Sequence, residues 1–129
     1  MPEPKGLIPA AGGSRVLLSF DIDGTLAAGD PPGPLSMDVV RLAKALGYRV
    51  GSASDHTVAF QRRMWALHQI DVDFVGHKHH LPDIRRRFSC QRHVHIGDTD
   101  LDRHYAELAG MEFYFVDQIP DSGGRDWIF

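Results

Sequence analysis

Several residue types are scarce in this chain, and each scarcity excludes a class of protein. A single cysteine, Cys90, stands among the 129 residues, so no internal disulfide can form and a reducing compartment is expected. No apolar run reaches the length of a membrane-spanning helix, and Met1 to Gly13 lack the apolar core of a signal peptide. We therefore expect a cytoplasmic protein with no membrane partner.

Positive charge is also in short supply. The formal net charge is −3 and the isoelectric point is about 6.2, which gives no support to a sequence-independent nucleic-acid surface. Only three residues are lysine, namely Lys5, Lys44 and Lys78, whereas aspartate outnumbers glutamate by 14 to 3. A site that combines a lysine with several carboxylates therefore has few candidate lysines.

What the chain does contain is an alternation of strand-like apolar runs with stretches of helical periodicity. Strands are predicted over 16–20, 48–54, 72–76, 92–96 and 112–116, and helices over 37–46, over 57–70, after Pro82 and up to Ala109. Such alternation predicts a mainly parallel five-stranded sheet covered on both faces, a doubly wound (Rossmann-like) three-layer α/β/α fold. We expect one domain over 15–129, without a cap domain, after a loose Pro/Gly-rich lead-in over 1–14.

Local signals place the helix ends and the buried helix faces. Ser36 is a predicted N-cap, and Gly47 and Gly110 are predicted helix stops. Each long helix carries an apolar stripe at helical spacing, which predicts packing against the sheet. These stripes are Val39, Ala43 and Leu46; Phe60, Met64 and Leu67, with Trp65 and His68 beside them; and Leu101, Tyr105 and Leu108.

The first predicted strand runs directly into Asp21-Ile22-Asp23-Gly24-Thr25. Period-2 alternation points Asp21 and Asp23 the same way, and Gly24 lets the chain turn sharply. Two carboxylates at the end of a buried strand repel each other, so we expect a cation between them, and Mg²⁺ suits because it prefers oxygen ligands. An ordinary polar turn is the alternative, since Asp and Gly are common turn residues.

Polar residues also follow the later strands, where ligands gather in such folds. Ser54 and Asp55 stand where a helix begins, so a hydroxyl and free N–H groups there could hold phosphoryl oxygens, although either residue could simply cap the helix. Lys78 is the only lysine near a predicted strand end, and it could balance carboxylates and a phosphate. The competing cations, Arg85–Arg87, are expected to form a solvated helix face.

The fourth strand leads into a second acidic segment, Gly97-Asp98-Thr99-Asp100-Leu101-Asp102. The favourable interaction of acids with a helix N-terminus explains Asp100 and Asp102. It explains Asp98 less well.

Taken together, these segments resemble the motifs of the haloacid dehalogenase superfamily of phosphatases. The first motif of that family reads D-x-D-G-T, the second is a Ser or Thr after a strand, the third is a Lys and the fourth reads G-D-x-x-x-D. Similar residues occur here in the same order, each after a separate strand, over roughly Val16 to Val116. They are Asp21-x-Asp23-Gly24-Thr25, Ser54, Lys78 and Gly97-Asp98-x-x-x-Asp102.

The resemblance implies a Mg²⁺-dependent phosphomonoester hydrolase. It makes Asp21 the nucleophile that forms an aspartyl-phosphate, and Asp23 the general acid and base. It implies Mg²⁺ binding by Asp21, Asp98, Asp102 and the Asp23 carbonyl, with Asp100 as the alternative to Asp102. It implies phosphate binding by Gly24, Thr25, Ser54, Asp55 and Lys78.

Without a cap, something else must cover the site from water. We favour a small phosphorylated metabolite as substrate and a homo-oligomer in which a neighbouring subunit is the lid, with Trp127-Ile128-Phe129 as a candidate docking segment. The alternative is a macromolecular substrate, either a phosphoprotein or a nucleic-acid end, and the charge balance disfavours the latter. A non-catalytic phospho-receiver-like module is a further alternative, although no Asp follows the third strand.

The eight histidines raise the question of a second metal site, above all at His77, His79 and His80. The sequence does not favour one, because a closed zinc site needs ligands of suitable geometry and the only cysteine lies in another segment. A role beside the phosphate for His77 or His79 is a weaker alternative. His93 and His95 alternate along a strand, so we expect them to share a face, packed or exposed.

Overall fold

The structure is a computed structural model that describes residues 15–119. The expected lead-in over 1–14 and the segment Trp127-Ile128-Phe129 lie outside the described residues. Within residues 15–119, no helix has both the length and the apolar composition that crossing a bilayer requires.

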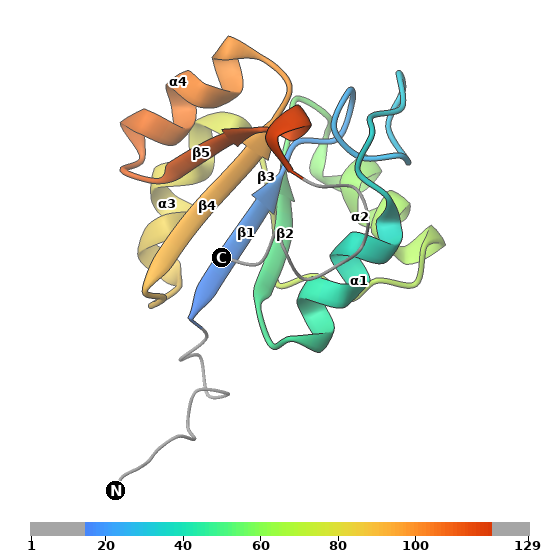
Figure 1. Cartoon of the computed structure of the whole chain (residues 1–129), viewed down its shortest axis with the longest axis horizontal. Coiled ribbons are helices and arrows are strands. Elements are labelled where there is room, and N and C mark those ends of the chain that lie inside the picture. The colour runs from blue at the N-terminus through green and yellow to red at the C-terminus, as the bar shows by residue number, and fades with distance from the viewer. Residues whose placement is uncertain (1–14, 120–129) are drawn as a thin grey trace, which may run out of the picture.

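The described chain forms a five-stranded parallel sheet in the order β3-β2-β1-β4-β5 (Figure 1). The strands are β1 (Val16–Phe20), β2 (Arg49–Ala53), β3 (Phe74–Gly76), β4 (Arg92–Gly97) and β5 (Glu112–Phe115). The strand order turns back at β1, since β2 and β3 lie on one side of it and β4 and β5 on the other. Ligands bind at such a switch point in open α/β sheets, beyond the carboxyl ends of the strands.

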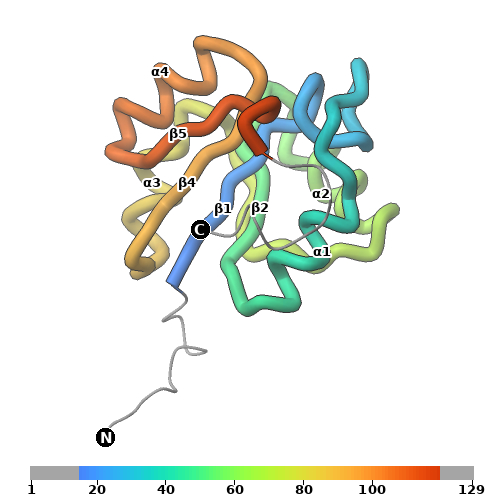
Figure 2. The backbone as a smooth tube through the Cα atoms, in the orientation of Figure 1, coloured from blue at the N-terminus to red at the C-terminus, as the bar shows by residue number. Residues whose placement is uncertain are grey.

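Helices cover both faces of the sheet, which confirms the predicted doubly wound architecture. Helices α1 (Met37–Ala45) and α2 (Val58–Leu67) lie on one face, and α3 (Leu81–Arg87) and α4 (Asp100–Leu108) on the other (Figure 1). Short 3₁₀ turns, η2 (Lys78–His80) and η3 (Val116–Gln118), follow β3 and β5. The backbone between β1 and α1 forms a long irregular excursion above the sheet (Figure 2).

The strand residues alternate between two apolar clusters, as period 2 requires. On β1, Val16, Leu18 and Phe20 pack into the cluster beneath α1 and α2, whereas Leu17 packs into the cluster beneath α3 and α4. Burial on both faces explains the nearly continuous apolar run of this strand.

The predicted helix ends are largely confirmed. Ser36 is the N-cap of α1 and accepts a hydrogen bond from the Val39 N–H, while Gly47 and Gly110 adopt positive φ after α1 and α4. The N-cap of α2 is Thr57, whose side chain accepts from the Phe60 N–H. Neither Ser54 nor Asp55 is therefore needed as a cap.

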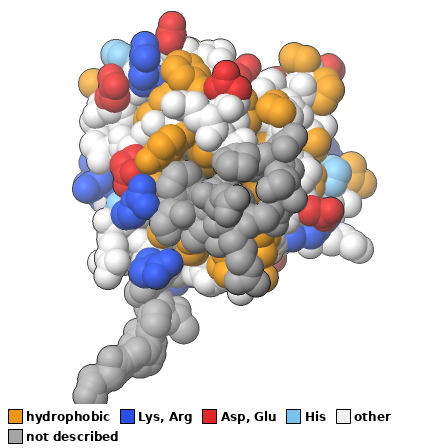
Figure 3. All heavy atoms as spheres, viewed as in Figure 1, with side chains coloured by type: hydrophobic (Ala, Val, Ile, Leu, Met, Phe, Trp, Pro, Cys, Tyr) orange, Lys and Arg blue, Asp and Glu red, His pale blue; other side chains and the backbone are white. Residues whose placement is uncertain are grey.

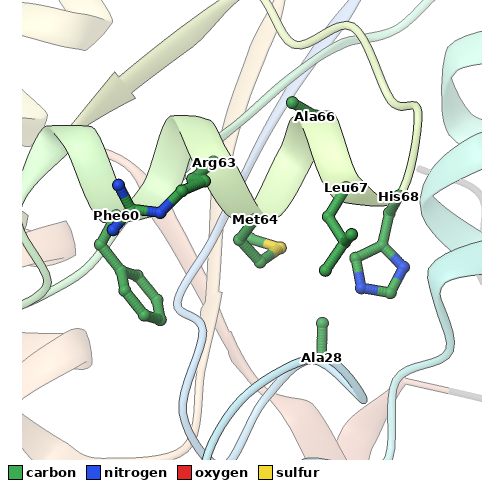
Figure 4. A pocket seen from close by; sticks show the side chains of 7 residues that line it. All are labelled: Ala28, Phe60, Arg63, Met64, Ala66, Leu67 and His68. Atoms are coloured by element: carbon green, nitrogen blue, oxygen red, sulfur yellow. The ribbon is translucent and has the colours of Figure 1, made fainter.

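The predicted buried stripe of α2 is wrong in two of its three positions. Met64 is buried, but Phe60 and Leu67 are 37% and 79% exposed, and Gln61 and Trp65 are buried in their place. Polar contacts with β2 set this rotation of the helix, as described next. The exposed side instead lines an open groove of about 650 Å³ that also includes His68 and Ala28 (Figure 4).

Ser52 of β2 is the anchor for α2. Its hydroxyl donates to Gln61 Oε1 at 2.6 Å and accepts from Trp65 Nε1 at 2.9 Å. The Gln61 amide also donates to the Gly76 and His56 carbonyls. Leaving these buried groups unpaired would cost more than exposing a leucine, so the polar network determines which side of the helix faces the sheet.

The predicted stripe of α4 is wrong at Leu101 and Leu108 for a similar reason, whereas Tyr105 is partly buried against the core. Leu101 and Leu108 are 47% and 65% exposed, while Asp102 and Ala106 face the sheet. Asp102 turns inward because its carboxylate has buried partners, described below. On α1, Val39 and Ala43 are buried as predicted, but Leu46 is 37% exposed.

These contacts predict that Ser52→Ala is much more destabilising than Leu67→Ala. The first change leaves the Trp65 N–H and the Gln61 carbonyl without their buried partner, at a cost of about 1–3 kcal/mol. The second removes an exposed side chain and should change the free energy of unfolding by no more than about 0.5 kcal/mol. Urea unfolding of both variants measures the difference, and the reverse ranking would contradict the observed helix orientation.

Candidate active site

A polar pocket of about 180 Å³ opens at the carboxyl ends of the strands. It is much smaller than the apolar groove on α2, but charged and polar side chains gather in it. Its lining residues are Asp21, Asp23, Pro31, Ser54, Asp55, His56, Lys78, Asp98 and Thr99. Six of these were predicted as site residues from the sequence, and His56, Thr99 and Pro31 were not.

Asp21 lies at the end of β1, where its N–H extends the ladder by donating to the Ile96 carbonyl at 2.9 Å. The residue is only 5% exposed. Burial, followed by the nearby charge of Asp102, raises the pKa of Asp21 to about 8, and Lys78 offsets this only in part. Without a further cation, the Asp21 carboxyl therefore keeps its proton at neutral pH.

Lys78 occupies the centre of the acidic cluster. Its ammonium nitrogen lies 3.7 Å from Asp21 Oδ1, 3.6 Å from Asp55 Oδ2 and 3.4 Å from Asp102 Oδ1. Burial alone would lower the pKa of Lys78, but the three carboxylates outweigh burial and raise it. Surface exposure, the ordinary expectation for a lysine, is excluded by a side chain that is only 6% exposed.

The competing arginines do not reach the pocket. Arg85, Arg86 and Arg87 are exposed on α3, and the last two pair with Asp83 at 3.6 Å. They form the solvated helix face that the sequence predicted.

Asp102 lies behind the pocket wall and is fully buried. His95 Nε2 lies 2.9 Å from Asp102 Oδ1, and the Thr99 N–H and hydroxyl donate to Oδ2 at 3.2 and 2.8 Å. Burial would raise the pKa of Asp102, but the hydrogen bond from His95 and the charge of Lys78 lower it. Asp102 is therefore a buried anion held by the protein itself.

His95 connects this anion to the sheet. Its Nδ1 lies 2.9 Å from the Ser19 hydroxyl, and Ser19 and His95 are register partners on β1 and β4. His93 shares the face and is also buried, with Nε2 2.7 Å from the Phe88 carbonyl. The alternation along β4 predicted the shared face, but the partnership with Asp102 requires the fold.

Two glycines of the motifs are required by close approach of acidic side chains. Gly24 has a φ of +73°, and a Cβ there would overlap the Asp98 carboxylate. A Cβ on Gly97 would likewise overlap the Asp102 carboxylate. The sequence explained Gly24 by its turn alone, and the contact of each glycine with an aspartate emerges from the fold.

Asp23 stands at the mouth of the pocket. Its Oδ1 accepts from the Asp30 N–H at 2.9 Å, and its Oδ2 lies 2.8 Å from His56 Nε2. Partial burial would raise the pKa of Asp23, but the hydrogen bonds from Asp30 and His56 and the charge of His56 lower it. His56 stacks on Phe60 with ring centroids 3.9 Å apart, which holds its imidazole over Asp23.

His56 is the functional candidate that the sequence reasoning missed. Its position directly after Ser54-Asp55, beyond the end of β2, was the available signal. The N–H of His56 also donates to the Ser54 hydroxyl at 3.0 Å, so the two residues form one compact turn at the pocket edge.

Gly24 and Thr25 are the two predicted phosphate ligands that do not line the pocket, so phosphate binding by Gly24 also stays a prediction. Thr25 lies inside the fold. It is fully buried, and among the described residues its hydroxyl has no hydrogen-bond partner. Phosphate binding by Thr25 stays a prediction.

The carboxylates fit a hard divalent cation. One oxygen each from Asp21, Asp98 and Asp102 lies within 4.8 Å of the other two, and oxygen donors are what Mg²⁺ prefers. Asp100 does not belong to this group, because its exposed carboxylate pairs with Arg103 at 3.1 Å. Asp21 and Asp98 open onto the pocket, whereas Asp102 is already bound by His95, Lys78 and Thr99.

Comparison with known proteins adds no assignment. No protein-family model matches the chain, and no curated protein matches it either.

The raised pKa of Asp21 predicts how Asp21→Asn changes stability with pH. Between pH 4 and 8 the folded protein retains a proton that the unfolded chain has released, so wild-type stability falls as the pH rises to about 8. The neutral amide avoids this loss. In EDTA the variant should therefore melt several degrees higher at pH 8, at roughly 4 °C per kcal/mol, and lose this advantage near pH 4.

Asp100→Asn is the matched control, because Asp100 is exposed outside the pocket. Thermal melts across this pH range measure the difference for both variants. A pH-independent difference for Asp21→Asn would show that Asp21 is already charged in the folded protein.

Proposed function

We propose that this chain is a Mg²⁺-dependent phosphomonoester hydrolase of the haloacid dehalogenase type, acting through an aspartyl-phosphate on Asp21. The observation that carries the proposal is the buried Asp21 carboxylate beside the Lys78 ammonium, in a pocket that also holds Asp98 and the Asp23–His56 pair. This combination joins a nucleophile, a fixed cation, an oxygen-donor metal site and a proton donor within one small pocket.

Asp98 and Asp21 would hold the Mg²⁺, with Asp102 behind them and the Asp23 carbonyl as a further donor. When bound, the ion neutralises charge on the phosphoryl oxygens and favours the ionised form of Asp21. The nearby Lys78 ammonium attracts the same oxygens, and the Ser54 hydroxyl is a second donor toward them. Asp55 would act on phosphate only through Lys78, with which it pairs.

In the first step an Asp21 oxygen forms a bond to phosphorus while the bond to the leaving oxygen breaks in line. Asp23 gives its proton to that leaving oxygen. In the second step Asp23 removes a proton from water, whose oxygen attacks phosphorus, so that Asp21 is released and inorganic phosphate forms. The phosphate dianion entering the pocket favours protonation of Asp23 through like-charge repulsion, and His56 at 2.8 Å is a proton source for it.

The activity predicted from this arrangement is Mg²⁺-dependent hydrolysis of p-nitrophenyl phosphate that is lost in Asp21→Asn. An amide is a far weaker nucleophile than a carboxylate, so the rate should fall by at least about 10³-fold. Asp100→Asn should retain the wild-type rate, because its side chain is exposed and pairs with Arg103. A folded Asp21→Asn protein with substantial activity would refute the nucleophile assignment.

A phospho-receiver-like module is the second candidate function. It would accept phosphate and hold it, and a receiver aspartate is expected after the third strand. Here β3 ends at Gly76 and is followed by His77 and Lys78. Stable phosphorylation without turnover would favour this alternative.

We propose that the chain forms a homo-oligomer in which a neighbouring subunit covers the site. The proposed substrate is a small phosphorylated metabolite. The expectation of a site without a cap rests on the short connections in the described chain: irregular backbone with a single Leu26–Leu35 bridge between β1 and α1, and α2 between β2 and β3. In Figure 3 acidic and basic side chains are interspersed on the face shown, which does not favour a nucleic-acid substrate.

A cytoplasmic location remains a proposal based on the single cysteine.

This arrangement predicts a dimer or larger assembly at assay concentrations. Light scattering coupled to size-exclusion chromatography measures the mass directly. A strict monomer with full activity on a small phosphate ester would exclude the lid, and would make a macromolecular substrate the better expectation.

A further inference from the structure

Three histidines converge on the turn that follows β3. One ring nitrogen each from His77, His79 and His80 lies within 4.8 Å of the other two. The His79 and His80 ring centroids are 4.2 Å apart, and His77 lies 5.5 and 5.3 Å from them. His79 and His80 are exposed and His77 is half-buried, so an ion from solvent can reach the cluster.

The backbone conformation explains this convergence. The segment is the 3₁₀ turn η2 with His77 as its N-cap, closed by the His80 N–H donating to the His77 carbonyl at 2.9 Å. His77 itself has extended dihedrals, and its N–H donates to His80 Nδ1 at 3.4 Å, which holds the two residues together at the start of the turn.

The surroundings of His80 favour its neutral imidazole. Partial burial lowers the pKa of His80, and the neighbouring His79 and His77 lower it further. Asp83 acts in the opposite direction, and Arg87 adds to the lowering. Neutral imidazole is the form that coordinates metal ions.

We propose that His77, His79 and His80 bind a transition-metal ion of the imidazole-preferring class, with Zn²⁺ foremost. Imidazole nitrogens suit Zn²⁺, Cu²⁺ and Ni²⁺, whereas the carboxylate pocket suits Mg²⁺, so the two sites differ in donor chemistry. Three protein nitrogens leave a fourth position of a tetrahedral ion open to water or another ligand. At Zn–N distances of about 2.0–2.1 Å the nitrogens must approach to roughly 3.4 Å, which rotation of exposed side chains can achieve.

Binding would also stiffen the turn that carries Lys78. The buried Lys78 side chain points from η2 toward Asp21, while the histidines on either side of it in the sequence form the cluster. An ion that joins His77 to His80 ties the two ends of this turn together. The site itself does not depend on the proposed phosphatase activity.

The test is isothermal titration of the tag-free full chain with ZnCl₂ after removal of metals, in about 10 mM Mg²⁺ to occupy the carboxylates. We expect one Zn²⁺ per chain with a dissociation constant on the order of 10 μM or tighter. His79→Ala and His80→Ala should each bind at least about 10-fold more weakly. Zinc should raise the melting temperature of wild type and not that of His80→Ala.

Two control variants distinguish zinc binding at this cluster from zinc binding by other residues of the chain. His104→Ala removes an exposed histidine outside the cluster, and Asp98→Ala removes a carboxylate of the pocket; both should bind Zn²⁺ like wild type. Circular dichroism, with His80→Gln as a second variant, checks that lost binding is not lost folding. Wild-type binding weaker than about 100 μM, or binding lost in Asp98→Ala and kept in His80→Ala, would overturn the proposal.

Discussion

The arrangement of carboxylates in the pocket depends on their ion pairs with the buried ammonium group of Lys78. This group lies between Asp21 and Asp102, and it lowers the cost of placing negative charge on these carboxyl groups in a medium that screens charges poorly. A buried ion pair contributes little net stability, but removal of one partner leaves the others uncompensated. One lysine does not balance these carboxylates fully, as the raised pKa of Asp21 indicates. The remaining imbalance is what supports a divalent cation in the proposed function.

Polar groups also determine how the helices are oriented on the sheet. Ser52 holds Gln61 and Trp65 of α2, and His95 holds Asp102 of α4. In both helices these buried hydrogen bonds override the apolar stripe, leaving leucines in solvent. The cost of an unpaired buried polar group exceeds the gain from covering one partly exposed leucine, so the polar partners determine the rotation.

The turn after β3 carries two kinds of functional side chain, a buried lysine and a group of imidazoles. Lys78 reaches inward to carboxylate oxygens, whereas His79 and His80 remain exposed beside His77. One short segment therefore contributes a lysine to the carboxylate cluster and three imidazoles to a separate cluster. An ion that binds imidazole would act on the same backbone that positions the lysine, without competing for the same ligands.

The sequence by itself determined the five strands, their parallel arrangement and the residues that follow them. Strand periodicity and turn residues are local properties, and parallel strands bring their carboxyl ends to one edge. Asp21, Ser54, Lys78 and Asp98 could therefore be predicted as neighbours.

Only the tertiary structure decided which of the remaining candidates join them. Asp102, and not Asp100, turns inward because His95 on β4 supplies a buried partner for its carboxylate. His56 contacts Asp23, which lies 33 residues earlier in the sequence. The histidines after β3 converge because His77 and His80 are joined by two hydrogen bonds across the turn, from the His80 N–H to the His77 carbonyl and from the His77 N–H to His80 Nδ1. Helix rotation and turn type depend on contacts between residues far apart in the chain, which no local pattern encodes.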